Sequence, residues 1–168
     1  MLGLFTGMII VYDILYFMVH LNRIPEFGPW RPQADGSISH NPYSWTSEAS
    51  LVFIEQPAGV GFSYAKDPNL IKNWNDYSAS VDHLLTLEAF FDRFPEQMNN
   101  SIGFYIASES YGGHYMPQLT LQIFENSPKL LSNFKGMLVG NPYTSFASGE
   151  IAMANVVWGL QLVPGNVW

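Results

Sequence analysis

The sequence predicts an α/β fold, in which a mostly parallel sheet is flanked by helices. Short apolar runs of the length of buried strands alternate with stretches of helical spacing along most of the chain. Strands connected through helices pair in parallel, with right-handed crossovers. Ser110 and Asn141 lie shortly after the ends of the apolar runs at 102–107 and 134–139. Parallel sheets place functional sites there, beyond the carboxyl ends of their strands.

The composition indicates one globular domain and excludes several classes of function. A chain of 168 residues is long enough to bury about 70% of its unfolded surface, and its hydrophobic content of 48% supports a packed core. The formal net charge of −7 argues against a nucleic-acid partner and against an anionic membrane surface. The chain has no cysteine, which excludes disulfides and thiolate metal sites.

Residues 1–21 form a strongly apolar stretch. A signal peptide is one interpretation, although the start lacks Lys and Arg and Asp13 lies within the run. A transmembrane helix is a second interpretation. Asp13 argues against it, because inserting an Asp into a membrane-spanning helix costs about 2.5–3.5 kcal/mol.

The segment from residue 26 to residue 42 is rich in Pro, Gly, Asp and Ser, so it predicts a loop with turns near Pro32 and Asp35. The aromatic residues at 43–45 are interpreted as core packing rather than as substrate contacts. The apolar run at 51–54 predicts a central strand, and the Pro and Gly residues that follow it predict a turn.

Residues 75–94 have the spacing of an amphipathic helix, with Asn75 or Asp76 as its cap and Pro95 at its end. His83 on this helix is interpreted as a structural or solvated residue. We expect Pro117 to interrupt the helix that follows Ser110, so that residues 118–126 form a second segment.

The apolar runs at 51–54, 102–107 and 134–139 are predicted to be neighbouring parallel strands. Ser110 should lie just past the end of the middle strand, in the strand–turn–helix order of a nucleophile elbow. Small residues must flank such a serine, because the turn brings the strand and the helix close together. Gly112 meets this requirement, and Ser108 stands where the pattern G-x-S-x-G has its first glycine.

Five stretches of the chain resemble the serine carboxypeptidase family, over roughly residues 25–168. The run SESYGGHYMP at residues 108–117 is similar to the family signature G-E-S-Y-[AG]-G-x-Y-x-P. The other stretches are EFGPWRP at 26–32, NPYSW at 41–45, EQPAGVGFSY at 55–64 and GNP at 140–142. Several motifs in the family's order make the resemblance specific.

The resemblance implies an α/β-hydrolase fold that is incomplete in this chain. Residues 25–150 are expected to form a partial α/β-hydrolase domain, and residues 151–168 to begin a cap-like insertion. Residues 1–24 are an apolar N-terminal segment of uncertain origin. The family's oxyanion segment, W-x-N-G-G-P-G-x-S-S, is followed by a stretch like residues 1–5. A third interpretation of the N-terminal segment is therefore that residues 7–22 are foreign to the family.

The resemblance also implies the roles of individual residues. Ser110 is the expected nucleophile, and the N–H of Tyr111 is an expected oxyanion donor. Glu26 and Glu109 are expected to share a proton and to bind the C-terminal carboxylate of a peptide or protein substrate, most strongly at acidic pH. No cofactor or metal is implied.

The chain departs from the family in its general base. The Asp and the His of an α/β-hydrolase follow the serine along the chain, yet no Asp follows Ser110 and His114 is the only later histidine. His114 is interpreted as structural. We therefore expect a serine-type carboxypeptidase in a truncated and inactive form. An acyltransferase of the same family and a non-enzymatic fragment remain alternatives.

The resemblance implies a place in the secretory pathway, either vacuolar or lysosomal or extracellular, and a membrane partner is not expected. Asn99 begins one N-glycosylation triplet, which is weak support for a secreted glycoprotein. The absence of cysteine departs from a family that is normally disulfide-bonded. The sequence leaves the oligomeric state open.

Overall fold

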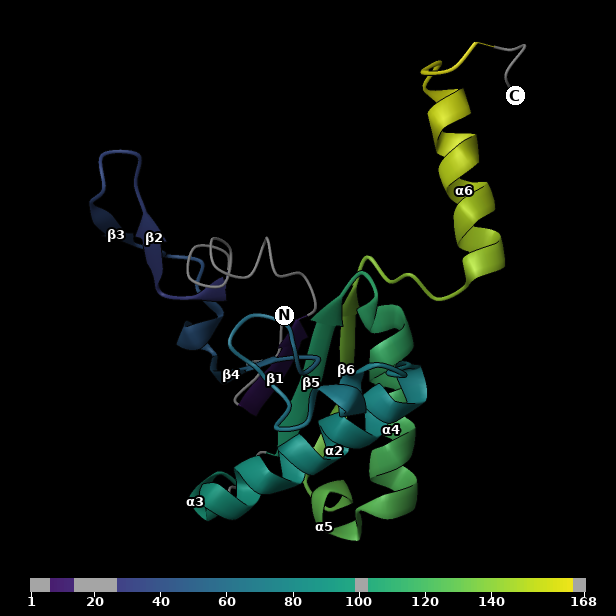
Figure 1. Cartoon of the computed structure of the whole chain (residues 1–168). Coiled ribbons are helices and arrows are strands. Elements are labelled where there is room, and N and C mark those ends of the chain that lie inside the picture. Colours follow the sequence, from purple (N-terminus) through teal and green to yellow (C-terminus); the bar gives the residue numbers. More distant parts are fainter. Residues whose placement is uncertain (1–6, 14–26, 99–102, 165–168) are drawn as a thin grey trace.

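Four parallel strands form the central sheet, in the order β4-β1-β5-β6 (Figure 1). The structure, a computed structural model, describes residues 7–13, 27–98 and 103–164. The strands are β1 (Gly7–Asp13), β4 (Ala49–Glu55), β5 (Phe104–Glu109) and β6 (Phe134–Gly140). This mostly parallel sheet with packed helices confirms the predicted α/β class.

Strand β1 corrects the predicted order of the strands. Ile10 of β1 is paired with Val52 of β4 on one side and with Ile106 of β5 on the other, so β4 and β5 are not direct neighbours. Strands β5 and β6 are neighbours, as predicted. The sequence GMIIVYD is apolar and rich in strand-forming residues, which suits a strand buried within a parallel sheet. These seven residues lie within a longer apolar stretch, so the sequence pattern alone does not mark them as a separate strand.

Two helices, α2 (Asp76–Arg93) and α4 (Gly112–Asn126), pack against each other and against the sheet. The core between them contains side chains with at most 1% of their surface exposed: Ile10, Leu87, Phe91, Phe104, Ile106, Met116, Leu119 and Ile123. The rings of Phe91 and Phe104 lie 4.9 Å apart. Each such side chain contributes roughly 1.5–3 kcal/mol when fully buried, so this core fixes α4 on β5.

Helix α2 begins and ends as the sequence predicts. Asn75 is the N-cap, and its side chain and that of Ser78 cap each other's backbone N–H groups. Phe94 is the C-cap and precedes Pro95, where the short helix α3 (Pro95–Met98) begins. His83 is 1% exposed, so the structure makes it a structural residue rather than a solvated one.

Helix α4 is continuous through Pro117, so the predicted interruption is wrong. Pro117 is exposed, and a proline in a helix interior removes a single backbone hydrogen bond. Tyr115 and Met116 before it and Leu119 after it are buried in the core. This packing on both sides of the proline keeps the helix intact, because tertiary contacts supply most helical stability.

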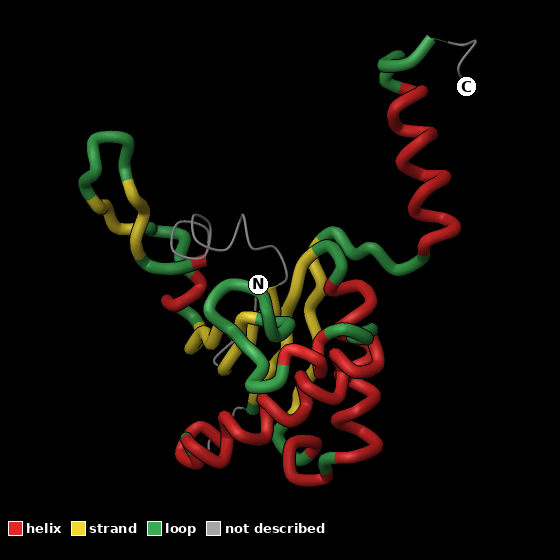
Figure 2. Tube along the Cα trace, in the orientation of Figure 1, coloured by secondary structure: helices red, strands yellow, loops and turns green. Residues whose placement is uncertain are grey.

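Two parts of the chain extend away from the sheet and its helices (Figures 1 and 2). The first is a hairpin of β2 (Trp30–Pro32) and β3 (Ile38–His40), where the sequence predicted only a loop with turns. The second is α6 (Phe146–Gly159), which has no buried residue. The remaining short helices are η2 (Trp45–Ser47), η3 (Pro68–Ile71) and α5 (Pro128–Leu131).

The aromatic residues after the hairpin do not belong to the core. Tyr43 is 77% exposed and Trp45 is 40% exposed, which corrects the interpretation of residues 43–45 as core packing. Trp45 packs edge-on against Phe27, with 4.8 Å between the ring centroids.

Among the helices of the described residues, none has both the length and the apolar character needed to cross a membrane.

Candidate active site

Ser110 occupies the sharp turn between β5 and α4. Its φ angle is 56°, in the left-handed region that few residues other than glycine adopt. The Ser110 N–H donates to the carbonyl oxygen of Gly140 at 2.9 Å. The Ser110 carbonyl oxygen accepts from the N–H groups of Gly113 at 3.1 Å and Tyr143 at 2.8 Å. These backbone hydrogen bonds hold the serine in the turn.

The two glycines after Ser110 make this turn possible. A Cβ atom on Gly112 would lie 2.4 Å from the Cβ atom of Ser108, and one on Gly113 would lie 2.5 Å from the carbonyl oxygen of Tyr143. Both distances are far below van der Waals contact, so only glycine fits without a rearrangement. Ser108 itself is 8% exposed, and its side chain occupies the space that Gly112 leaves.

Tyr111 follows the serine and directly precedes the first residue of α4. Within the described residues, its backbone N–H donates to no acceptor. The first N–H groups of a helix have no partner inside the helix and lie at the positive end of its dipole. The N–H of Tyr111 is therefore suited to a developing negative charge beside Ser110.

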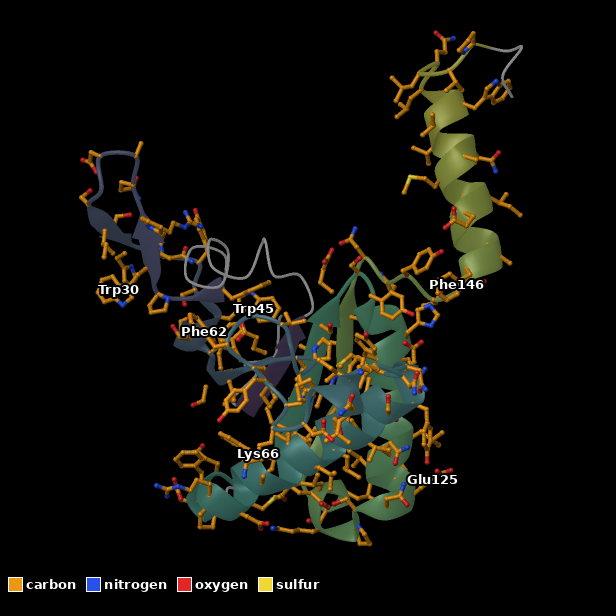
Figure 3. The ribbon with its side chains drawn as sticks, in the orientation of Figure 1. Trp30, Trp45, Phe62, Lys66, Glu125 and Phe146 are labelled. Carbon is orange, nitrogen blue, oxygen red and sulfur yellow. The ribbon has the colours of Figure 1, made fainter. Side chains whose placement is uncertain are left out.

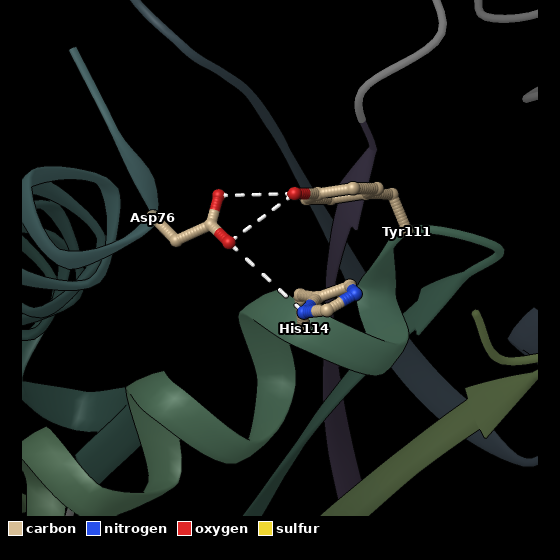
Figure 4. Close-up of polar contacts among 3 residues, drawn as sticks. All are labelled: Asp76, Tyr111 and His114. Atoms are coloured by element: carbon tan, nitrogen blue, oxygen red, sulfur yellow. Dashed lines mark hydrogen bonds and ion pairs between the residues drawn. The ribbon is translucent and has the colours of Figure 1, made fainter. Parts of the chain in front are cut away.

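The ring of Tyr111 is held in a polar contact with Asp76 of α2 (Figure 4). The Tyr111 hydroxyl group donates to Oδ1 of Asp76 at 3.3 Å and to Oδ2 at 3.2 Å. His114 Nδ1 lies 4.0 Å from the same Oδ2 atom. Desolvation, followed by the charge of Asp76, raises the pKa of the Tyr111 phenol. The sequence suggested Asp76 only as a helix cap, and no local pattern reveals this contact.

Within the described residues, Ser110 Oγ has no hydrogen bond to a histidine. His114 is directed to Asp76 through Nδ1, and its ring stacks on Tyr111 with 4.7 Å between centroids. Its Nε2 atom is buried without a hydrogen-bond partner. His83 lies deeper in the core, and burial lowers its pKa to about 4.

The expected carboxylate pair is described only in part. Glu109 is the last residue of β5, and its side chain is exposed beside Ser110. Glu26 lies outside the described residues, so its pairing with Glu109 stays a prediction. Asn141, which follows β6, has a left-handed φ of 42° and lies at the same end of the sheet.

The turn after β4 bounds a cleft of about 560 Å³. Glu55 closes this turn, because its Oε2 atom accepts from the N–H of Phe62 at 2.6 Å. Phe62 is 83% exposed and lies on the side of the sheet opposite to Phe146 of α6 (Figure 3). The elbow thus lies after β5, and a cleft with both polar and apolar side chains in its lining lies beside the end of β4.

A parallel sheet with a nucleophile elbow after one of its inner strands defines an α/β-hydrolase. A family model described as serine carboxypeptidase matches residues 22–168, and the chain belongs to this family of hydrolases. Serine carboxypeptidase-like 46 of Arabidopsis thaliana is 41% identical over 140 residues, which are 82% of this chain and 29% of that protein. The vacuolar serine-type carboxypeptidase ATG42 of Saccharomyces cerevisiae is 42% identical over 119 residues, 71% of this chain and 22% of that protein.

The fold is similar to a solved structure of the same class. The crystal structure of Kex1(delta)p, a prohormone-processing carboxypeptidase from Saccharomyces cerevisiae, matches with a TM-score of 0.76 at 23% identity. The match covers 96% of this chain and 35% of that chain. The chain spans less than a third of the length of the two relatives named above, from Arabidopsis and from yeast.

Proposed function

We propose that Ser110 is the nucleophile of a serine-type carboxypeptidase site, which releases C-terminal residues through an acyl-enzyme. The observation that carries this proposal is the left-handed conformation of Ser110 between β5 and α4. A non-glycine residue in that region costs on the order of 1–3 kcal/mol and persists where its surroundings hold it, often at functional sites. Gly112 and Gly113 provide those surroundings.

The chemistry follows from the elbow. Ser110 Oγ attacks the carbonyl carbon of the last peptide bond while a base takes the hydroxyl proton. The Tyr111 N–H donates to the oxyanion, and a single donor of this kind is worth about 100- to 1000-fold in kcat. The C–N bond then breaks, the leaving amino acid takes the proton, and water later hydrolyses the ester on Ser110.

The carboxylate anchor is the second part of the proposal. Glu109 lies next to the nucleophile and is exposed, so it is available to a substrate at the end of the sheet. Two carboxyl groups in contact cannot both ionise, which keeps one of them neutral and able to donate to an anion. We propose that Glu109 and Glu26 form such a pair and bind the substrate's C-terminal carboxylate at acidic pH.

The general base is proposed to come from elsewhere in the family fold. In the family, the Asp and the His of the triad lie far downstream of the serine, and this chain spans less than a third of its two curated relatives. We propose a secretory route with a vacuolar or extracellular destination, which the vacuolar relative supports. Glycosylation at Asn99 belongs to the same proposal, and this residue lies outside the described part of the chain.

The test supplies a base from solution. The 168-residue chain is incubated with a fluorophosphonate, with and without imidazole, and the adduct is located by mass spectrometry. Reaction forms the Oγ–P bond and breaks the P–F bond, so fluoride leaves and imidazole takes the proton. We expect imidazole to accelerate labelling of Ser110, Ser110→Ala to abolish it, and the matched variant Ser108→Ala to retain it. Labelling that is unchanged in Ser110→Ala would reject Ser110 as the nucleophile.

A further inference from the structure

Asp76 links α2 to the nucleophile elbow across a long separation in the sequence. The residue lies in the first turn of α2, and its carboxylate accepts from the hydroxyl group of Tyr111, 35 residues further along the chain. The same carboxylate faces Nδ1 of His114 at 4.0 Å (Figure 4). One acidic side chain is therefore in contact with two ring side chains of the elbow and of the first turns of α4.

These contacts restrain the Tyr111 ring from several directions. The ring stacks on His114 at an interplanar angle of 28° and meets Tyr115 edge-on, with 5.0 Å between centroids. Its hydroxyl end is fixed by Asp76, while its backbone leads directly from Ser110 into α4. Only two rotatable bonds separate the ring of a tyrosine from its Cα atom. Restraint of the ring therefore limits the movement of the Tyr111 Cα atom, to which the N–H group is joined.

Helix capping does not account for Asp76. The N-cap of α2 is Asn75. Its side chain accepts from the N–H of Ser78, and the Ser78 side chain accepts from the N–H of Asn75. Asp76 thus adds charge to the first turn, but its side chain is directed to Tyr111 and His114 instead of capping a backbone N–H. A carboxylate with only a dipole role would not need to approach the elbow.

We infer that Asp76 is a positioning residue for the nucleophile elbow. It holds the rings of Tyr111 and His114 and through them adds to the restraint that the hydrogen bonds of the Ser110 carbonyl oxygen place on the Tyr111 N–H. The inference rests on the proposed function only in the use of that N–H as an oxyanion donor. Displacement of a catalytic group by about 1 Å can cost about 100-fold in rate, so loss of the restraint should be measurable.

The experiment compares Asp76→Ala with Asp92→Ala in the 168-residue chain. Asp92 is a matched control, because it lies on the same helix and contacts Lys129 of α5, away from the elbow. Two readouts are independent of catalysis: the ionisation of Tyr111, followed by tyrosinate absorbance against Tyr111→Phe, and the amide resonances of Tyr111 and Gly112. We expect Asp76→Ala to lower the ionisation midpoint of Tyr111 and to shift both resonances, and Asp92→Ala to do neither.

The third readout is the imidazole-assisted labelling of Ser110 by a fluorophosphonate. Asp76→Ala should lower the rate constant of the chemical step by about 10-fold while the affinity for the probe is unchanged. The double variant Asp76→Ala/Tyr111→Phe should label Ser110 at about the same rate as either single variant, because both substitutions remove the same contact.

The outcomes separate this inference from the proposed function. If wild-type Ser110 is not labelled, the proposed nucleophile fails, and the two spectroscopic readouts decide the role of Asp76. If Asp76→Ala lowers only the unfolding temperature and leaves the midpoint, the resonances and the labelling rate as in wild type, Asp76 is merely structural and the inference is wrong.

Discussion

Gly112 lies so close to Ser108 that a Cβ atom on the glycine would be 2.4 Å from both the Cβ and the Oγ of the serine. The next atom in range is Val139 Cγ1, at 3.5 Å, which is an ordinary contact distance. At position 112 the elbow is therefore tight because of one neighbour, the serine at position 108.

This relationship predicts a rescue. Gly112→Ala should destabilise the protein by about 1–3 kcal/mol, the usual cost of overpacking. Adding Ser108→Gly should recover most of that loss, because it removes the only atoms in severe contact. Urea unfolding of the single and double variants measures the effect. Gly159→Ala, at a helical glycine with open space around it, is the control and should cause no loss. Independent, additive effects of the two substitutions would contradict the packing argument.

Pro117 gives a second prediction about α4. Alanine at this exposed position restores a backbone N–H in the middle of the helix and removes the clash of the proline ring with the preceding turn. The gain is offset in part, because proline also restricts the unfolded chain. We expect Pro117→Ala to stabilise the protein by up to about 2 kcal/mol in urea unfolding. Pro128→Ala should bring no such gain, because Pro128 lies at the start of α5 where proline is favourable.

The sequence contained enough information for the elbow and for α2. Ser110 could be placed because an apolar strand, a glycine pair and a helix occur in an order that few other structures require. The start and the end of α2 could be placed because Asn75 and Pro95 act through local backbone hydrogen bonding. These features depend on residues that are close together along the chain.

The features that escaped prediction depend on distant contacts or on competing local signals. Strand β1 was concealed within a longer apolar stretch, and only its pairing with β4 and β5 defines it. The contact between Asp76 and Tyr111 joins residues 35 positions apart, and either residue alone has ordinary surroundings in the sequence. Pro117 indicated a helix break, but core packing on both sides of it proved stronger. Glu26 lies outside the described residues, so half of the proposed carboxylate anchor stays a prediction.

His83 predicts how stability depends on pH. Burial at 1% exposure lowers its pKa to about 4 from an ordinary value of 6.5. The unfolded chain therefore binds this proton at higher pH than the folded protein, and stability is lost as the pH falls from 6.5 towards 4. A lowering of the pKa from 6.5 to about 4 means that the free energy of unfolding falls by about 3 kcal/mol over this pH range. The unfolding free energy of His83→Gln should depend less on pH between these values than that of the wild type. The control His40→Gln, at an exposed site, should keep the wild-type dependence. Equal slopes in all three proteins would contradict the burial of His83.

The last prediction concerns turnover by the 168-residue chain. Within the described residues, no histidine is hydrogen-bonded to Ser110 Oγ, and the nearest candidate in the sequence, His114, is directed to Asp76. Loss of the base from a serine triad costs about a millionfold in kcat. We therefore expect no detectable release of C-terminal residues from peptides near pH 5, measured by mass spectrometry of the products. Turnover that disappears in both Ser110→Ala and His114→Gln, but persists in His40→Gln, would identify His114 as the base and overturn its interpretation as a structural residue.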